Sequence, residues 1–299
     1  MKNVRVLHLA KVAGISGSEA HLLSLLPSLV QRGWDVRFLM LHEHEPGAWD
    51  FARKLVSQGV TLDAIPLGAD VDPPAFLRLC AYLARRRPTI LHTHLVHGDV
   101  YGQLAGTAMR VPVRVSTKHG FNEFREGRGF ALADRSIAAL SHRHIAISRG
   151  LARYLKETEG FAEETFEIVH YGIRPQPDAR PYDDDVPRLL CVGRLIPIKG
   201  HLVLLRAFRD ARAEIPDLEL EIAGRGPLEP ALRAYARELG IEDAVRFLGQ
   251  VNPIQTAIER TAISVVAPLR EGFRGGTLQA TEREQPVITA AICGLSQLV

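Results

Sequence analysis

Segments with the apolar pattern of a buried strand alternate along almost the whole chain with segments that have the pattern of an amphipathic helix. Parallel strands require such crossover helices, whereas antiparallel strands need only a tight turn. The alternation therefore predicts an α/β fold of doubly wound parallel sheets. Pro27 should kink or divide the first helix. In the first half, strands are expected at 4–10, 36–41, 61–65, 90–95, 113–117, 144–147 and 167–169, and helices at 20–31, 48–58, 74–86, 99–109, 130–141 and 149–158.

A proline-rich, acidic segment interrupts this alternation at residues 174–187, where four prolines flank the run Asp183-Asp184-Asp185. Such a composition cannot build a core and is typical of a linker. We therefore predict a first domain at 1–174, a linker at 175–187 and a second domain at 188–299. In the second domain, strands are expected at 189–192, 218–223, 245–248, 263–267 and 286–289, and helices at 200–214, 228–239, 253–260 and 276–284.

The composition excludes several classes of protein. No run reaches 18 apolar residues, so no membrane span is expected, and the apolar run after Met1 is too short for a signal peptide. We therefore expect a cytoplasmic protein. The three cysteines are far apart and lack metal-ligand spacing, which favours reduced, mostly buried thiols.

Charge is distributed unevenly, because residues 1–180 carry a net +5 and eleven of the twelve histidines, whereas residues 181–299 carry −2. An acidic acceptor, or peripheral contact with the inner, anionic face of a membrane, is a plausible partner for the basic half. Nucleic acid is not expected as a partner, since the basic residues are scattered and lack interleaved aromatic residues.

The stretch 189–201 has the outline of a phosphate site. A strand-like apolar run leads to Gly193, then to Arg194 and Lys199, and then directly to a helical pattern. Helix N-termini carry unsatisfied N–H groups and the positive end of the helix dipole. Arginine adds a planar fork and lysine a mobile charge, a pair that suits a diphosphate. The alternative is two ordinary surface cations at a strand–helix junction.

Three closely spaced histidines, His92, His94 and His97, raise the possibility of a metal site. In a strand His92 and His94 share a face, whereas His97 falls in the following loop, and no carboxylate is nearby in the sequence. We therefore favour acceptor-side or structural histidines and assign no metal ligands.

Several short motifs occur in a fixed order, and together they closely resemble the retaining glycosyltransferases of family 4. The similarity covers nearly the whole chain, from Val6 to Val299. It implies a GT-B fold, two Rossmann-like domains facing a cleft, and a nucleoside-diphosphate sugar as donor without a metal or other cofactor. The motifs are Val192-Gly193-Arg194-Leu195, Lys199-Gly200, Ile222-Ala223-Gly224-Arg225-Gly226-Pro227, Phe247-Leu248-Gly249 and the stretch 265–280.

The resemblance also implies roles for individual residues. Arg194 and Lys199 would neutralise the diphosphate, and Glu271 would bind the sugar hydroxyls. Gly17, in the glycine-rich loop 14–18, would face the donor phosphates and sugar. His119, in the loop Lys118-His119-Gly120, would approach the donor sugar. Backbone N–H groups of Gly272, Phe273 and Arg274 would lie near the diphosphate, and the Arg274 side chain could add a cation.

This sequence departs from the family pattern at two places. The second carboxylate of the family's Glu-x7-Glu pair is replaced by Gln279, which loses a charge-assisted bond to the ribose, and Glu282 is a candidate substitute. The sequence stops at Val299, where similar proteins usually continue through another strand and helices, so the second domain is expected to be incomplete.

These features support a transferase that moves a sugar to a glycan or lipid-linked acceptor, in polysaccharide biosynthesis for example. Two alternatives remain at this stage. One is a catalytically impaired nucleotide-sugar-binding protein of the same fold, suggested by Gln279. The other is a sugar-nucleotide epimerase of the GT-B fold, which the motifs resemble less well.

Overall fold

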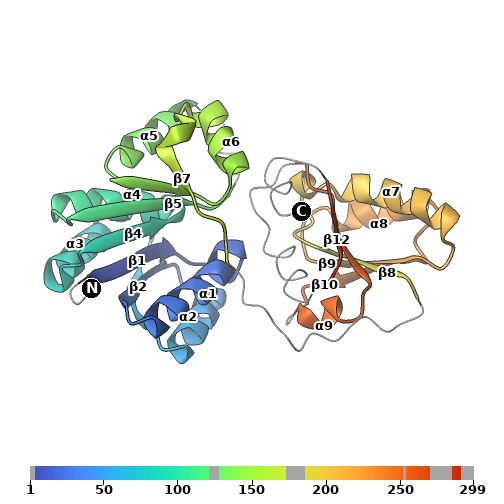
Figure 1. Cartoon of the computed structure of the whole chain (residues 1–299), viewed down its shortest axis with the longest axis horizontal. Coiled ribbons are helices and arrows are strands. Elements are labelled where there is room, and N and C mark those ends of the chain that lie inside the picture. Colours follow the sequence, from blue (N-terminus) through green and yellow to red (C-terminus); the bar gives the residue numbers. More distant parts are fainter. Residues whose placement is uncertain (1–3, 121–127, 173–185, 252–253, 270–284, 291–299) are drawn as a thin grey trace. The chain divides into compact units, whose positions relative to one another are not determined.

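A computed structural model of the chain describes residues 4–120, 128–172, 186–251, 254–269 and 285–290. Contacts within the chain divide it into two compact units, Met1–Gly172 and Ile173–Val299 (Figure 1). Each unit has its own parallel sheet and its own apolar core. Most of the expected linker, 175–185, falls outside the described residues.

The first unit contains all seven expected strands, and each neighbouring pair is parallel. Their order in the sheet is β3-β2-β1-β4-β5-β6-β7. The sequence-adjacent strands β3 and β4 are therefore separated, and the winding direction reverses between β1 and β4. The strands are β1 (Arg5–Lys11), β2 (Asp35–His42), β3 (Thr61–Pro66), β4 (Ile90–His94), β5 (Val113–Lys118), β6 (Arg143–Ala146) and β7 (Phe166–Ile168).

Six helices of the first unit follow the predicted pattern. Helix α1 runs unbroken through Pro27, so the predicted division of this helix is wrong. Proline removes one backbone hydrogen bond, but Leu22, Leu26 and Pro27 are all buried, and this packing holds the helix together. The helices are α1 (Gly17–Gln31), α2 (Pro46–Ser57), α3 (Pro73–Arg86), α4 (Leu95–Ala108), α5 (Arg128–Ala138) and α6 (Arg149–Glu159), with the short 3₁₀ segment η2 (Glu163–Thr165).

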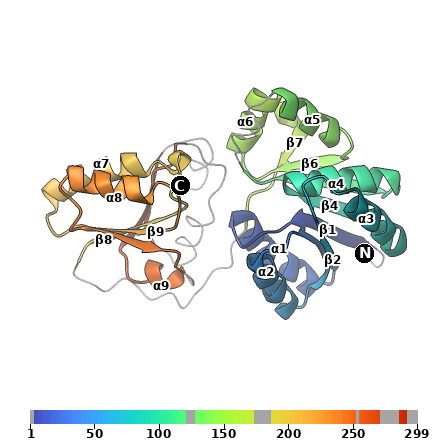
Figure 2. The ribbon, with the colours of Figure 1, turned by 180° about the vertical axis from the view of Figure 1, so that it is seen from behind.

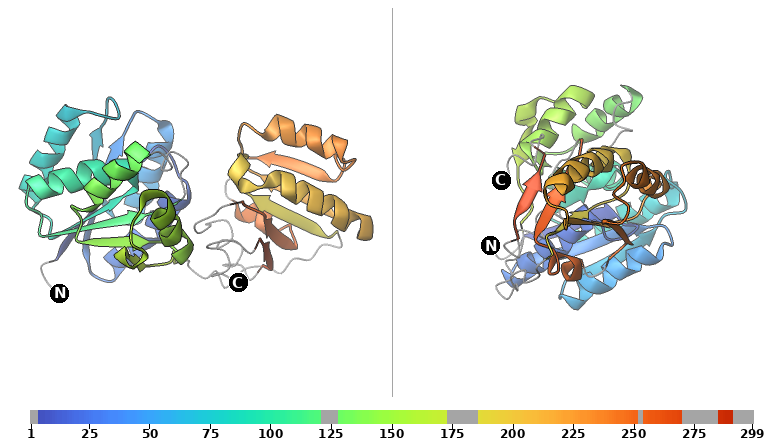
Figure 3. Two further views of the ribbon diagram at one scale, coloured as in Figure 1. Left: turned by 90° about the horizontal axis from the view of Figure 1, so that it is seen from above. Right: turned by 90° about the vertical axis from the view of Figure 1, so that its right-hand side faces the viewer.

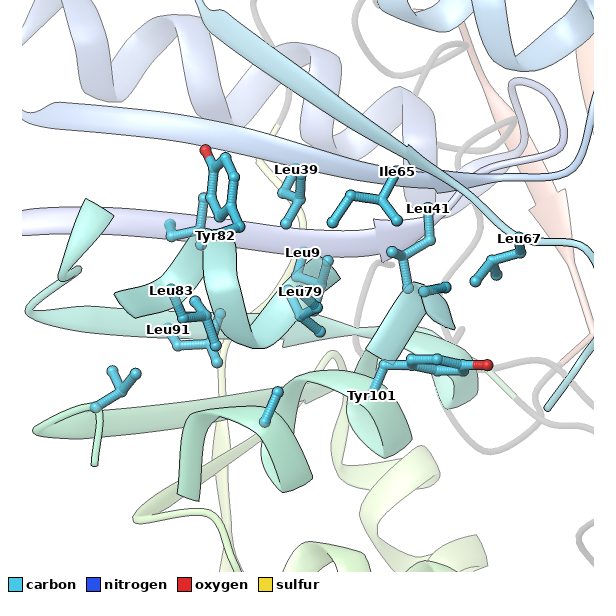
Figure 4. Close-up of a cluster of buried hydrophobic side chains, with 14 residues drawn as sticks. Leu9, Leu39, Leu41, Ile65, Leu67, Leu79, Tyr82, Leu83, Leu91 and Tyr101 are labelled. Carbon is cyan, nitrogen blue, oxygen red and sulfur yellow. The ribbon is translucent and has the colours of Figure 1, made fainter. Parts of the chain in front are cut away.

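Two separate apolar clusters show that the first sheet is covered on both faces. Leu9, Leu39 and Leu41 of the strands pack with Leu79 and Leu83 of α3 (Figure 4). The other cluster packs Phe38 and Met40 of β2 with residues of α1 and α2. Figure 2 shows α1 and α2 side by side, away from α5 and α6. Alternate residues of one strand therefore face different helix layers, as a doubly wound sheet requires.

The described residues of the second unit repeat the design with five parallel strands, in the order β10-β9-β8-β11-β12. Helices α7 and α8 lie side by side (Figure 3). The winding direction reverses between β8 and β11. The elements are β8 (Arg188–Val192), η3 (Pro197–Lys199), α7 (His201–Glu214), β9 (Glu219–Ala223), α8 (Glu229–Glu238), β10 (Val245–Gly249), α9 (Gln255–Ile258), β11 (Ile263–Val266) and β12 (Val287–Thr289).

The expected helix 276–284 falls outside the described residues. Within the parts of the chain that the structure describes, no helix is long and apolar enough to cross a membrane. Cys191 is buried and Cys80 is half-buried.

Candidate active site

In the second unit, the segment after β8 is held by backbone hydrogen bonds to the segment after β9. The N–H of Gly193 donates to the carbonyl of Ala223 at 2.8 Å, and the N–H of Leu195 donates to the carbonyl of Arg225 at 2.9 Å. On the other side, the N–H of Leu269 donates to the carbonyl of Ile198 at 2.9 Å. The segments that follow β8, β9 and β11 therefore form one connected edge at the carboxyl ends of the strands, the usual ligand edge of an open α/β sheet.

Two glycines allow these segments to approach so closely. Gly200 has φ +66°, and a Cβ atom there would lie 1.8 Å from the carbonyl oxygen of Ala267. Gly224 has φ +154°, and a Cβ atom there would lie 1.8 Å from the carbonyl oxygen of Gly193. A side chain at either position would meet backbone that cannot easily move, so the motif glycines are required by the fold itself.

Arg194 and Lys199 both lie on this edge. Arg194 follows β8 and is exposed, and Lys199 ends η3 immediately before Gly200, the N-cap of α7. The first N–H groups of α7 are therefore next to a fixed cation, an arrangement that favours phosphate. The other residues assigned to the diphosphate and sugar, Glu271, Gly272, Phe273, Arg274 and Gln279, lie outside the described residues, and so does Glu282.

In the first unit, Gly17 is the first residue of α1. A capping box joins Ser16 and Glu19 at this helix end: the Ser16 N–H donates to Oε2 of Glu19 at 3.0 Å. Among the residues that the structure describes, no heavy atom lies within 4 Å of the position that a Gly17 Cβ would occupy. Packing within the unit does not require glycine here, so the position has room for a close ligand.

His119 follows β5 and has hydrogen-bond partners at both ring nitrogens. Its Nε2 lies 2.9 Å from Nδ1 of His94, and its Nδ1 lies 2.6 Å from the hydroxyl of Tyr171. The other nitrogen of His94, Nε2, lies 2.9 Å from Nδ1 of His8. A hydrogen-bonded row therefore runs from His8 through His94 and His119 to Tyr171.

Burial keeps this row uncharged. It lowers the pKa of His8, His94 and His119 well below the usual value, and the neighbouring imidazoles lower these pKa values further. Each neutral imidazole has one N–H and one lone pair, so the row is satisfied in either direction of donation. The predicted bond from His119 to a sugar hydroxyl requires that one present partner is given up.

His21 of α1 completes this cluster. Its ring stacks on Tyr171 with centroids 4.1 Å apart, and burial lowers the pKa of His21 to about 4. Sequence reasoning missed His8, His21 and Tyr171, because nothing in the spacing of these residues links them to His119. The closely spaced His92, His94 and His97, to which no metal was assigned, are also not all brought together, since Nε2 of His97 lies 2.8 Å from a carboxylate oxygen of Asp70.

Lys118, next to His119, is fixed in the interior by two carboxylates. Its Nζ lies 2.9 Å from Asp99 of α4 and 2.8 Å from Asp134 of α5, and all three side chains are almost fully buried. Asp99 also accepts hydrogen bonds from the hydroxyls of Thr93 and Ser116. This network anchors the end of β5 to two helices and so positions the loop that carries His119.

Models of two protein families match the chain. The model described as "glycosyl transferase 4-like domain" matches residues 16–172, more than half of the chain. The model described as "glycosyl transferases group 1" matches residues 186–299.

Individual proteins that are similar to this chain in sequence are also named as glycosyltransferases. The chain is 32% identical over 127 residues to a GDP-mannose-dependent phosphatidylinositol monomannoside mannosyltransferase of Mycolicibacterium smegmatis, which covers 40% of this chain and 33% of that protein. It is 23% identical over 304 residues to the putative glycosyltransferase EpsF of Bacillus subtilis, covering 95% of this chain and 78% of EpsF. The aligned region therefore amounts to about a third of the mycobacterial relative.

Among solved structures, HepE of Anabaena in complex with UDP and glucose superimposes with a TM-score of 0.80. The match covers 99% of this chain and 83% of HepE at 16% identity, and at that identity it establishes the fold alone. It confirms the predicted GT-B fold. The two family models show that this chain belongs to family 4 of the glycosyltransferases.

Proposed function

We propose that this chain is a retaining glycosyltransferase that moves a sugar from a nucleoside-diphosphate donor to a glycan or lipid-linked acceptor. The observation that carries the proposal is the connected edge of the second unit, where Arg194 follows β8 and Lys199 immediately precedes the N-cap of α7. The names of the relatives agree with this proposal, since they include a GDP-mannose-dependent mannosyltransferase and a structure that contains UDP.

The reaction requires negative charge on the leaving diphosphate to be stabilised as the bond from the anomeric carbon to the phosphate oxygen breaks. Arg194 and Lys199 supply positive charge for this step in our proposal. The acceptor hydroxyl attacks on the face from which the diphosphate leaves, so configuration is retained. A phosphate oxygen of the leaving group takes the hydroxyl proton, and no protein side chain needs to act as a general base.

His119 and Gly17 are proposed to contact the donor from the first unit. The Tyr171 hydroxyl can be exchanged for a sugar hydroxyl at Nδ1 of His119, whereas His94 lies within the sheet and keeps Nε2 fixed. The basic charge of this half fits an acidic or lipid-linked acceptor and peripheral contact with an anionic membrane surface.

Gln279 supports one alternative, a protein that binds a nucleotide sugar without transferring it. An amide loses the charge-assisted bond that a carboxylate makes to ribose, which costs on the order of 1–2 kcal/mol. This alternative predicts donor binding with no turnover, whereas our proposal predicts both.

The proposal is tested by calorimetric titration of the chain with UDP, GDP and ADP and with their sugar conjugates, followed by turnover assays with the nucleotide that binds. In the Arg194→Ala/Lys199→Ala variant we expect the affinity to fall by more than about 100-fold, because two charge-assisted bonds are lost and each contributes about 1.5–3 kcal/mol.

The matched control is Arg212→Ala/Arg246→Ala, which removes the same charge from the same unit. Arg212 pairs with Asp243, just before β10, and Arg246 pairs with Glu219 at the start of β9, so both lie at the amino ends of the strands. This control should bind nucleotide as the parent chain does. Failure of the folded parent chain to bind any nucleotide would rule out the donor-site assignment.

A further inference from the structure

Helices α3 and α4 lie side by side in the first unit and expose no carboxylate. Helix α3 contains no acidic residue, and the acidic residue of α4, Asp99, is buried. Protein surfaces normally mix charges of both signs, so the exposed side of these two helices is unusual. Four other helices each expose at least one carboxylate: Asp50 of α2, Glu157 of α6, Glu214 of α7 and Glu238 of α8.

The exposed side of the two helices combines aliphatic side chains with arginines. In α3, Leu77 is 67% exposed, and Arg78 and Arg85 are also exposed. In α4, Leu104 is 41% exposed, and the exposed Met109 follows at the end of the helix. With the residue that precedes α3 by two positions, these side chains make up what we call the α3–α4 face: Val71, Leu77, Arg78, Arg85, Leu104 and Met109.

We propose that the α3–α4 face docks on the surface of an anionic lipid bilayer. Aliphatic side chains are stabilised when they leave water for the boundary between headgroups and acyl chains. Arginines are attracted by anionic lipids and bind phosphate through parallel N–H bonds, whereas a carboxylate would be repelled. The inference deepens the proposed function and rests on it in one respect, since a lipid-linked acceptor is itself part of a membrane.

The arginines of the face keep a net positive charge. Arg78 pairs only loosely, because its Nη2 lies 3.9 Å from Asp72, whose other carboxylate oxygen caps α3 by accepting from the N–H of Ala75 at 2.8 Å. The guanidinium carbon of Arg85 lies 6.0 Å from the centroid of the Tyr82 ring, a contact that leaves its charge in place. Both guanidinium groups are therefore suited to lipid phosphates.

One end of the face adjoins the carboxyl ends of the strands. Val71, which is 82% exposed, lies in the segment between β3 and α3. The neighbouring Asp70 is bound by Nζ of Lys11 at 3.2 Å and by Nε2 of His97 at 2.8 Å, so its charge is compensated. Lys11 ends β1, just before the loop that leads to Gly17. A bilayer on the α3–α4 face would therefore place a lipid-linked headgroup beside the edge that carries Gly17.

The kind of side chain on the face favours a lipid surface over a soluble protein partner. The residues that dominate protein interfaces are often tyrosine and tryptophan, whereas leucine and valine are under-represented among them. Here the tyrosines of the two helices, Tyr82 and Tyr101, belong to the buried core (Figure 4), and Phe76 packs against that core. The aliphatic side chains are instead the ones left exposed.

The test is sedimentation of the full chain, without nucleotide, with vesicles of equal parts phosphatidylglycerol and phosphatidylcholine. We expect binding that falls as NaCl is added, and little binding to vesicles of phosphatidylcholine alone. Arg78→Gln/Arg85→Gln should weaken binding at least tenfold, because each arginine near an anionic surface strengthens it about fivefold. Leu77→Asp should also weaken binding at least tenfold, since it removes an aliphatic contact and adds a repelled charge.

The matched controls lie on α2, which packs on the opposite face of the sheet. Arg53→Gln/Lys54→Gln removes the same charge, and Val56→Asp places a carboxylate at a residue that is 53% exposed. Both should bind vesicles as the parent chain does. The variants do not change Arg194 or Lys199, so nucleotide binding should be unaffected, and failure of vesicle binding is distinguishable from failure of the donor site.

Three results would overturn the proposal. The first is a folded parent chain that does not bind the anionic vesicles, and the second is an equal loss of binding in the α3 and α2 variants. The third is self-association of the parent chain without vesicles that Leu77→Asp abolishes, because the α3–α4 face would then be an interface between two copies of the chain.

Discussion

The Tyr171 hydroxyl lies 2.6 Å from Nδ1 of His119, a residue 52 positions earlier in the chain. Because His94 holds the other ring nitrogen of His119 at 2.9 Å, this imidazole is fixed at both ends before any ligand is bound. Tyr171 is almost fully buried, and burial raises its pKa, so its hydroxyl remains protonated and can donate or accept. A sugar hydroxyl that binds Nδ1 of His119 must therefore replace Tyr171.

This competition predicts different effects for two substitutions. Tyr171→Phe removes the competing hydroxyl and leaves Nδ1 of His119 without that partner, so we expect a loss of about 0.5–1.5 kcal/mol in the free energy of unfolding. The affinity for the donor sugar should stay the same or increase.

His119→Ala should instead weaken binding of the nucleotide sugar at least tenfold while binding of the bare nucleotide changes little. Chemical denaturation and calorimetry measure these quantities, and an equal loss of sugar affinity in both variants would contradict the exchange.

The substitution Gly17→Ala shows whether glycine is needed at the start of α1 for packing or for contact with the donor. No atom of the described part of the chain lies within 4 Å of the added Cβ, so we expect the melting temperature of the variant to stay the same or rise. If donor phosphates or sugar approach this backbone, the KM for the donor should rise at least tenfold. Gly129→Ala is the matched control, because Gly129 is the second residue of α5, is exposed and also has open space around its Cβ. An unchanged donor KM in Gly17→Ala would remove Gly17 from the site.

The fold was predictable because the sequence patterns that indicate its strands and helices are local. Each strand of the two sheets is a short apolar run, and the expected boundaries differ from the observed ones by one or two residues, as for 113–117 and β5 (Val113–Lys118). The helix boundaries differ more: α4 begins at Leu95, four residues before the expected 99–109, α1 begins three residues before the expected 20–31, and α5 ends three residues before the expected 130–141 does. The motif glycines were also recognisable, since Gly200 and Gly224 belong to the motifs that carry the resemblance, and backbone contacts in this chain require glycine at both positions.

The histidine cluster was not predictable, because pairing between distant strands creates it. His8 reaches His92 only through the parallel pairing of β1 and β4, and Tyr171 reaches His119 from beyond β7. The spacing of His92, His94 and His97 suggested a group, but the chain enters α4 at Leu95 and carries His97 to Asp70 instead. Short spacing in sequence therefore grouped His97 with histidines that it does not contact and gave no sign of His8.

Lys118 supports the loop of His119 through a buried ion network, and its removal should be costly. Lys118→Met leaves Asp99 and Asp134 buried without their cation, so we expect a loss of about 3–5 kcal/mol in the free energy of unfolding. The comparison is Lys156→Met, since the side chain of Lys156 is exposed and lies 3.9 Å from Glu163. That change should cost less than about 1 kcal/mol. Urea denaturation followed by circular dichroism measures both, and similar costs for the two lysines would show that the network is not important for stability.

The buried histidines make the first unit sensitive to acid. Burial lowers the pKa of His21 to about 4 in the folded chain, whereas an unfolded histidine titrates near 6.5. Between these two values the unfolded state binds more protons than the folded state, so stability is complete above about pH 6.5 and is lost as the pH falls towards 4. The other histidines of the cluster act in the same direction.

His21→Gln removes one of these titrating groups, so the dependence of the free energy of unfolding on pH should become shallower by up to about one proton in the window from pH 6.5 to 4. The matched control is His44→Gln, at an exposed histidine of the same unit, which should keep the slope of the parent chain. Urea denaturation at a series of pH values gives the three slopes. If His21→Gln and His44→Gln have the same slope, His21 does not remain neutral in the folded chain, and its stacking on Tyr171 would then tolerate a charge.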